Sequence, residues 1–123
     1  MTTPKLEPRA ARLDIVIEQG ATFRLPCTWK DENGTPVDLS LYTAQMQIRE
    51  EIASSAALIS LSSGTGEIEL GVALGTILVT IPATTTATFT WTQGVYDLEL
   101  TDLTGGVTRL LQGVVIVSPE VTR

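Results

Sequence analysis

The sequence predicts an all-β fold, a single antiparallel β-sandwich of about seven or eight strands behind an extended N-terminal arm. Apolar and polar residues alternate along most of the chain, as in strands with one buried face. Turn residues interrupt this alternation at intervals of roughly 8–12 residues. The 123 residues, 43% of them hydrophobic, suffice for one core. We therefore expect an arm over residues 1–12, a sandwich over 13–118 and a tail over 119–123.

The first half of the sandwich contains four predicted strands. Residues 13–18 alternate and Gly20 ends them, and residues 22–30 form the next strand. Pro26 lacks an N–H, which places that second strand at a sheet edge or a bulge. Asn33-Gly34 marks a tight turn, 37–41 a connector, 42–49 a strand, 50–56 a loop and 59–61 a short strand. The inward rows are Leu13, Ile15, Ile17; Phe23, Leu25, Cys27, Trp29; Tyr42, Ala44, Met46, Ile48; Ile59 and Leu61.

The second half continues the pattern. Strands are predicted at 67–70, 77–81, 94–101 and about 107–117, and residues 83–92 form one helical turn or a crossing loop. Gly113 marks a bulge in the last strand. Gly94-x-Tyr96 before an inward Leu98 is typical of the F strand of immunoglobulin-like domains, with Cys27 in the B-strand position. Leu98 stands where the partner cysteine would be, so no disulfide supports this topology.

Composition excludes several function classes. The chain has no histidine, which removes Ser-His-Asp and Cys-His catalysis and imidazole zinc ligation. Its net charge of −6 disfavours binding to nucleic acid and to anionic lipid. There is no apolar leader and no run long enough to span a membrane. We expect a soluble, non-enzymatic protein made in the cytoplasm, with no cofactor and no metal.

Chemically suggestive groups have simpler structural explanations. The pairs Glu67/Glu69 and Asp97/Glu99 lie two apart and predict solvated strand faces rather than an acid–base pair in a cleft. The acidic loop at 31–36 fails the EF-hand pattern. Most aromatic residues fall on inward rows, although Trp29 and Trp91 leave sugar stacking open as an alternative.

Several phrases resemble a known group of proteins. They are Ile17-Glu18-Gln19-Gly20-Ala21-Thr22-Phe23 followed by Trp29, Asp38-Leu39-Ser40 before Tyr42-Thr43-Ala44, Val95 to Leu100, Val107 to Gly113, and Val115 to Arg123. Together these segments are similar to small structural proteins of tailed bacteriophages and prophages. That group resembles the N-terminal β-sandwich domain of baseplate upper proteins, which attaches to other virion proteins. The resemblance brings no catalytic motif.

The resemblance implies a multi-copy adaptor in the tail, neck or baseplate of a virion, made in the bacterial host cytoplasm. Its partners would be other virion proteins, whether tail, neck, portal-proximal or capsid, and further copies of itself in a symmetric homo-oligomer. The contacts are expected in the arm and the tail, at Arg9, Arg12, Pro119, Glu120, Val121 and Arg123. The alternatives are a capsid cement or decoration protein on the phage head and, more distantly, a carbohydrate-binding module contacting the host surface.

Overall fold

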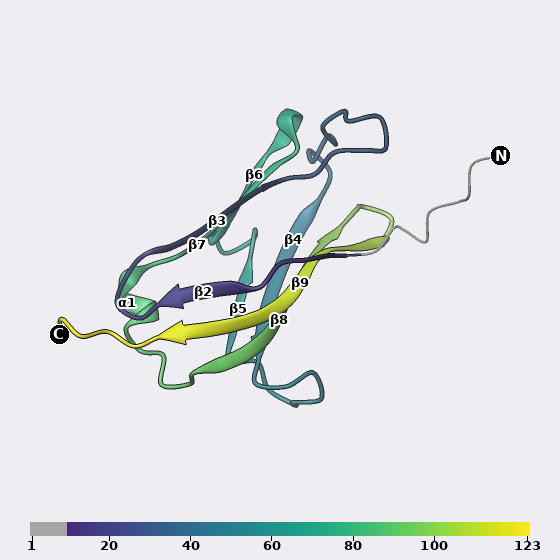
Figure 1. The fold of residues 1–123 in the computed structure, drawn as a ribbon. Helices are drawn as coiled ribbons and strands as arrows, with labels where there is room; N and C mark the ends of the chain where they lie inside the picture. Colours follow the sequence, from purple (N-terminus) through teal and green to yellow (C-terminus); the bar gives the residue numbers. More distant parts are fainter. Residues whose placement is uncertain (1–9) are drawn as a thin grey trace.

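The computed structural model describes residues 10–123, which form two β-sheets (Figure 1). The larger sheet has the order β1 (Ala11–Arg12), β9 (Val107–Ser118), β8 (Gln93–Thr101), β4 (Thr43–Arg49), β5 (Ile59–Ser62), and β2 (Ile15–Glu18) also pairs with β9. The smaller sheet has the order β3 (Phe23–Thr28), β7 (Thr76–Ile81), β6 (Ile68–Gly71). A 3-10 turn, η1 (Val72–Leu74), and one helical turn, α1 (Ala83–Thr86), complete the described elements. The predicted all-β class is confirmed.

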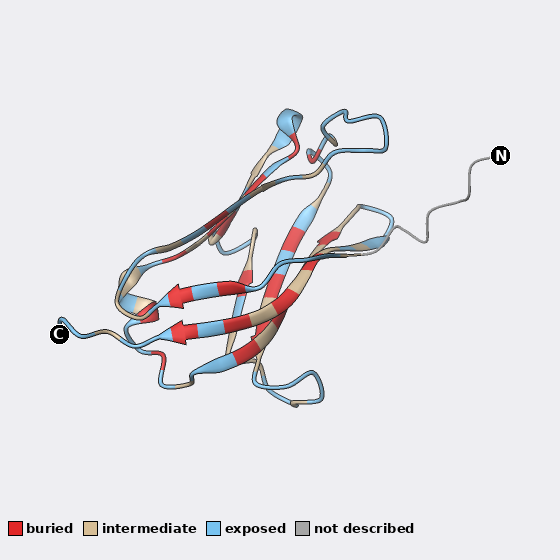
Figure 2. Ribbon diagram, in the orientation of Figure 1, coloured by how far each residue is buried: buried red, intermediate tan, exposed pale blue. Residues whose placement is uncertain are grey.

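The inner faces of both sheets contribute to one hydrophobic core, seen as alternating buried positions in Figure 2. Ile17, Met46, Ile48, Val79 and Leu98 are completely inaccessible to solvent. The predicted inward rows are therefore confirmed along most strands. Five positions of those rows, Phe23, Cys27, Trp29, Tyr42 and Ile59, are only partly buried against the core. Pro26 lies on β3, an edge strand, as its missing N–H requires.

The prediction of purely antiparallel pairing is wrong at the N-terminus. β1 and β2 both run parallel to β9, with Ala11 opposite Leu111 and Ile15 opposite Val115. The physical reason is topological, because β2 leads directly into β3 of the opposite sheet rather than into a hairpin with β9. The first two strands of the described chain therefore lie directly beside its last strand, β9.

The boundary predicted at Leu13 also needs correction. Ala11 and Arg12, assigned to the arm, already pair with β9, and the Leu13 N–H donates to the Gln112 carbonyl oxygen. The inward direction predicted for Leu13 is wrong, because its side chain is 40% exposed. A Cβ at Gly113 would collide with the Leu13 carbonyl oxygen. The chain therefore crosses very close to β9 at this point. Residues 1–9, which include Arg9, lie outside the described residues.

The bulge predicted at Gly113 is wrong as well. The register shifts between Leu98 and Glu99, which pair with Leu111 and Arg109, so Leu110 is the extra residue. Gly113 instead pairs regularly with Tyr96. Its lack of a side chain serves the close approach of Leu13.

Two acidic residues organise tight turns. Asp31 accepts hydrogen bonds from the backbone N–H groups of Asn33 and Thr35, and Gly34 has φ +81°. Asp102 accepts hydrogen bonds from Thr104 and from the Gly106 N–H between β8 and β9. Both turns agree with the prediction from their residue types. The loop at 31–36 is thus explained by turn chemistry.

The segment 83–92 contains the predicted helical turn, α1. This segment follows β7 of the smaller sheet and is hydrogen-bonded to the turn between β2 and β3. Thr86 is fully buried, and its hydroxyl accepts a hydrogen bond from the Gly20 N–H and donates to the Ala21 carbonyl oxygen. Gln19 donates its side-chain amide to the Phe89 carbonyl oxygen. Among residues 10–123 no helix reaches the length and apolar character of a membrane-crossing segment.

Candidate interaction surface

The outer face of the larger sheet is hollowed into an open depression of about 450 Å³. Its lining comes from β1, β4, β8 and β9 and from Ile52 in the loop after β4. Three arginines, Arg12, Arg49 and Arg109, line it. They are half of the six Lys and Arg residues found between positions 10 and 123. Cations are thus concentrated on one face of an acidic chain.

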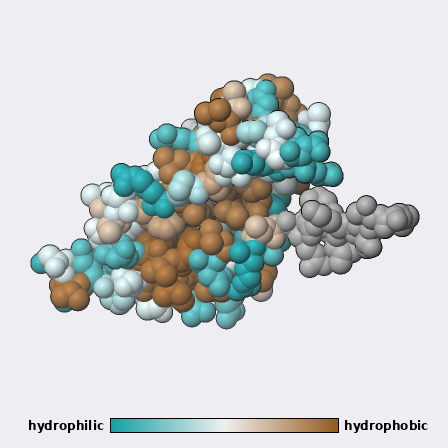
Figure 3. All heavy atoms as spheres, turned by 45° about the horizontal axis from the view of Figure 1, so that its top comes forward, coloured by the Kyte–Doolittle hydropathy of each residue, from teal (hydrophilic) through white to brown (hydrophobic). Residues whose placement is uncertain are grey.

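Apolar side chains cross one end of this outer face in a row that we call the apolar strip, defined as Val16, Val95, Val114 and Ile116. Val95 pairs with Val114 and Val16 pairs with Ile116, so four residues from three strands lie together. Val16 is 57% exposed and Ile116 is 41% exposed. Figure 3 shows apolar side chains gathered over β2 and β9 on the face in view. The strip occupies positions where alternation normally places polar side chains.

A charged row lies next to the strip. The Arg109 Nε lies 3.5 Å from the Asp97 Oδ2 and 3.9 Å from the Glu99 Oε2. The bulge explains this arrangement, since Arg109 is two residues from the buried Leu111 and on a regular strand would share its inward direction. The extra residue Leu110 turns Arg109 outward onto the two carboxylates.

Asp97 and Glu99 flank a single arginine on the outer face of the larger sheet. Both carboxylates are more than a third exposed and both lie beside one guanidinium. The charged row therefore fits the solvated strand face predicted for this pair, and the structure adds the arginine between them. At Arg49, one guanidinium nitrogen donates to the Ser54 carbonyl oxygen and the other to the Gln47 side chain.

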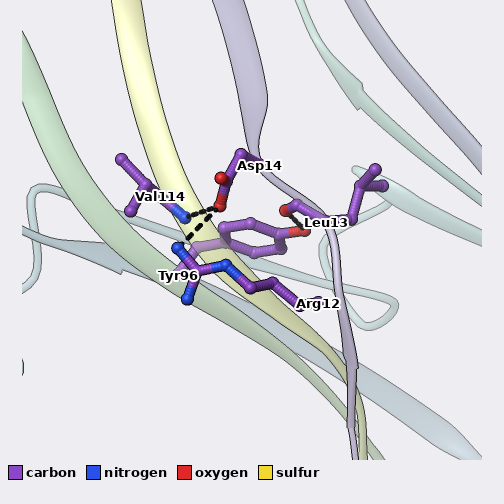
Figure 4. Close-up of polar contacts among 5 residues, drawn as sticks. All are labelled: Arg12, Leu13, Asp14, Tyr96 and Val114. Carbon is purple, nitrogen blue, oxygen red and sulfur yellow. Dashed lines mark hydrogen bonds and ion pairs between the residues drawn. The ribbon is translucent and has the colours of Figure 1, made fainter.

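The crossing from β1 to β2 forms a polar junction, drawn in Figure 4. The Tyr96 hydroxyl donates to the Leu13 carbonyl oxygen at 2.6 Å, and the Val114 N–H donates to the Asp14 Oδ1 at 2.9 Å. Arg12 lies 3.2 Å from the same Asp14 oxygen. Burial, followed by the nearby Asp14 charge, raises the pKa of Tyr96 to about 12. The junction thus anchors the start of the described chain to β8 and β9.

The predicted contact residues are divided between two places. Arg12 lies in the junction, and Arg9 falls outside the described residues. At the other end of β9, Pro119 and Val121 are exposed, whereas Glu120 is partly buried and its N–H donates to the Gln19 side chain. Arg123 donates to the Glu120 carbonyl oxygen at 3.5 Å.

The aromatic residues and the cysteine pack mainly inward. Trp29 meets Tyr42 edge-on with ring centroids 5.4 Å apart, and Trp91 lies 4.9 Å from Phe89. Both indoles are partly buried against the core, so each offers only part of its surface to a sugar. Burial raises the pKa of the Cys27 thiol, which keeps it in its less reactive protonated form. No group of three or more potential metal ligands occurs within residues 10–123.

Sequence reasoning missed the apolar strip. Its signal was present as valine and isoleucine on outward positions of otherwise alternating segments, at residues 16, 95, 114 and 116. Only the pairing registers reveal that these scattered positions adjoin.

Comparison with family models and with curated proteins gives no match. Function is therefore inferred from the residues described above and from the resemblance of the sequence phrases.

Proposed function

We propose that this chain is a non-enzymatic structural protein of a tailed-bacteriophage virion, acting in several copies as an adaptor in the tail, neck or baseplate. The proposal includes an immunoglobulin-like sandwich as its fold. Strand order β9-β8-β4-β5 facing β3-β7-β6, with β2 parallel to β9, is compatible with that topology. In this proposal β8, which contains Tyr96, corresponds to the F strand.

The observation that carries the adaptor role is the placement of the two attachment points. The first described strand, β1, begins its pairing with β9 at Leu111, and the C-terminal tail leaves β9 after Ser118. These two points lie seven residues apart along the extended strand β9. At about 3.3 Å per residue these points are roughly 20 Å apart. Figure 1 shows β1 and the C-terminus toward opposite ends of the molecule. Terminal segments leaving from opposite ends suit a protein that connects two neighbours.

Each attachment point is held firmly. Tyr96 and Asp14 secure the N-terminal side, while Gln19 accepts a hydrogen bond from the Glu120 N–H on the C-terminal side. A force applied through either terminal segment would therefore reach the core strands β8 and β9. This mechanical continuity is useful in an adaptor.

The test is deletion of residues 2–9, which leaves β1 and its pairing with β9 in place. We expect the shortened protein to fold with an unchanged unfolding temperature but to be missing from purified particles of the phage or prophage that encodes it. The full chain, detected by a labelled antibody in electron micrographs, serves as control and should decorate the tail, neck or baseplate. Normal incorporation of the deletion variant would contradict the role of the arm.

The position of the label separates the alternatives. Antibody on the head would make the chain a cement or decoration protein. Intact particles without label would contradict a virion function altogether. Either result leaves the fold unaffected.

A further inference from the structure

We propose that the outer face of the larger sheet is a docking surface for a second copy of this chain, related by a two-fold axis parallel to β8 and β9. The inference deepens the proposed function and rests on it for the presence of several copies. It names the surface through which two copies would meet, which is separate from both terminal segments.

The residue types on this face are those of protein interfaces. Val16 and Ile116 of the apolar strip are exposed to solvent. Exposed apolar residues that cluster into a patch are typical of contact sites between proteins. The cations beside it are Arg12, Arg49 and Arg109, with no lysine. Interfaces are enriched in arginine and depleted in lysine, because the planar guanidinium forms directed hydrogen bonds and packs well.

Charge favours a second copy as the occupant. The whole chain carries a net charge of −6, so two copies repel each other through most orientations. On this face Arg12 and Arg109 are paired with Asp14, Asp97 and Glu99, and the other outward charges are Arg49 and, at the end of β2, Glu18. Meeting through this face, which is much closer to neutral than the chain as a whole, brings opposite charges together and minimises the repulsion. A surface that carries charges of both signs can be electrostatically complementary to a second copy of itself.

The strand registers make the central part of the face self-complementary. A two-fold axis between β8 and β9, parallel to both, places each β8 over the β9 of the other copy. Residues that pair between β8 and β9 within one copy then also face each other between copies. Val95 would meet Val114 of the second copy. Glu99 would meet Arg109 of the second copy.

The outer strands extend this match. The same axis places β4 over β1 and β2 of the other copy. Arg49, which pairs with Val95, would then face Asp14, whose carboxylate is bonded to Val114. Sheets that pack face to face lie about 10 Å apart, and the side chains named here can span that gap.

The first experiment is sedimentation of the full chain over a range of concentrations, with an exposed apolar residue changed to a charged one. I116E should weaken dimerisation by about 30-fold or more, because it places a carboxylate within the apolar strip. V72E is the matched control, since Val72 is 48% exposed and lies away from this face. It should leave dimerisation unchanged. A chain that stays monomeric at millimolar concentration, or equal effects of both variants, would overturn the proposal.

The second experiment tests the axis by charge reversal. R109E and E99R alone each place like charges opposite one another, and each should weaken self-association by about tenfold. An equimolar mixture of the two variants restores the cross-pair and should form a mixed dimer. R24E makes the same charge change as R109E on the smaller sheet and should dimerise like the original chain. Failure of the mixture to associate would overturn the two-fold arrangement.

These outcomes are distinct from failure of the proposed function. A chain found in the tail whose solution dimer resists I116E would overturn the docking face alone. A chain that dimerises as proposed but labels no particle would overturn the virion role alone.

Discussion

The outer faces of the two sheets obey the same alternation yet differ in chemistry. On the larger sheet, the outward positions include the apolar strip and the charged row around Arg109. On the smaller sheet, the outward positions of β3 and β7 are Arg24, Pro26, Thr28, Thr76, Leu78 and Thr80. One face thus combines a four-residue apolar strip with paired charges, and the other carries three threonines, one arginine and a single apolar pair, Pro26 with Leu78.

This difference separates folding from association. Valine and threonine are both β-branched, and both suit a strand facing solvent. Folding of the larger sheet therefore does not require valine at positions 16, 95 and 114. What valine adds is an apolar surface, whose burial is favourable only when something covers it. We therefore expect the two inner faces to respond alike to substitution and the two outer faces to respond differently.

Truncating a buried side chain should lower the free energy of unfolding by a similar amount on either inner face. Leu98 of the larger sheet and Ile77 of the smaller sheet are essentially inaccessible. L98A and I77A should each lower the free energy of unfolding by about 3 kcal/mol through lost burial and a residual cavity. Urea unfolding followed by tryptophan fluorescence measures both. If one variant cost less than a third of the other, the two sheets would not share one cooperative core.

The close approach of Leu13, between β1 and β2, to Gly113 of β9 should be the most sensitive backbone site of the larger sheet. G113A places a methyl group against the Leu13 carbonyl oxygen, which must move, and should cost about 2 kcal/mol. G64A is the matched control, because its new Cβ would meet only the Ser62 hydroxyl at 3.7 Å. Hydrogen exchange should show faster opening of the β2 amides in G113A alone. Unchanged protection of β2 would contradict the role given to the close approach.

The Tyr96 hydroxyl should stabilise the same link between β1 and β2 by a smaller amount. Y96F removes its hydrogen bond to Leu13 and leaves the carbonyl oxygen without that donor, at a cost of about 1 kcal/mol near neutral pH. The folded pKa of Tyr96, about 12, lies above its ordinary value of 10.0. The stabilisation is therefore complete below pH 10 and declines as the pH rises from 10 toward 12.

Urea unfolding at pH 7 and pH 11 measures this decline. The original chain should lose more stability between these two values than Y96F does, since Y96F cannot ionise at that position. Equal losses in the two proteins would show that Tyr96 titrates alike in the folded and unfolded states.

Alternation along the sequence is enough to predict most strands and their buried sides. Rows such as Ala44, Met46 and Ile48 follow from period two alone, because burial of one face depends only on local direction. Turn residues such as Asp31 and Gly34 are equally local signals. Local patterns in the sequence therefore predict both the fold class and the inner faces.

The errors share a different cause. The parallel pairing of β2, the role of Gly113 and the bulge at Leu110 all depend on how β9 meets distant segments. The Asp14–Val114 hydrogen bond joins residues 100 positions apart. The apolar strip likewise exists only after three strands are paired. Properties of a surface built from several strands require the register, which period two does not supply.

The smallest expected change in stability provides the sharpest test of the contrast between the outer faces. V16T on the larger sheet and T80V on the smaller sheet exchange the outward chemistry without changing branching at Cβ. Each should alter the free energy of unfolding of the monomer by no more than about 0.5 kcal/mol, as is usual for surface positions. V16T should nevertheless weaken self-association, whereas T80V should leave it unchanged, because only Val16 belongs to the apolar strip. Urea unfolding at low protein concentration and sedimentation at high concentration measure the two quantities separately. If V16T destabilised the monomer by more than about 1 kcal/mol while association stayed the same, valine would be there for folding, and the contrast between the two outer faces would carry no information about partners.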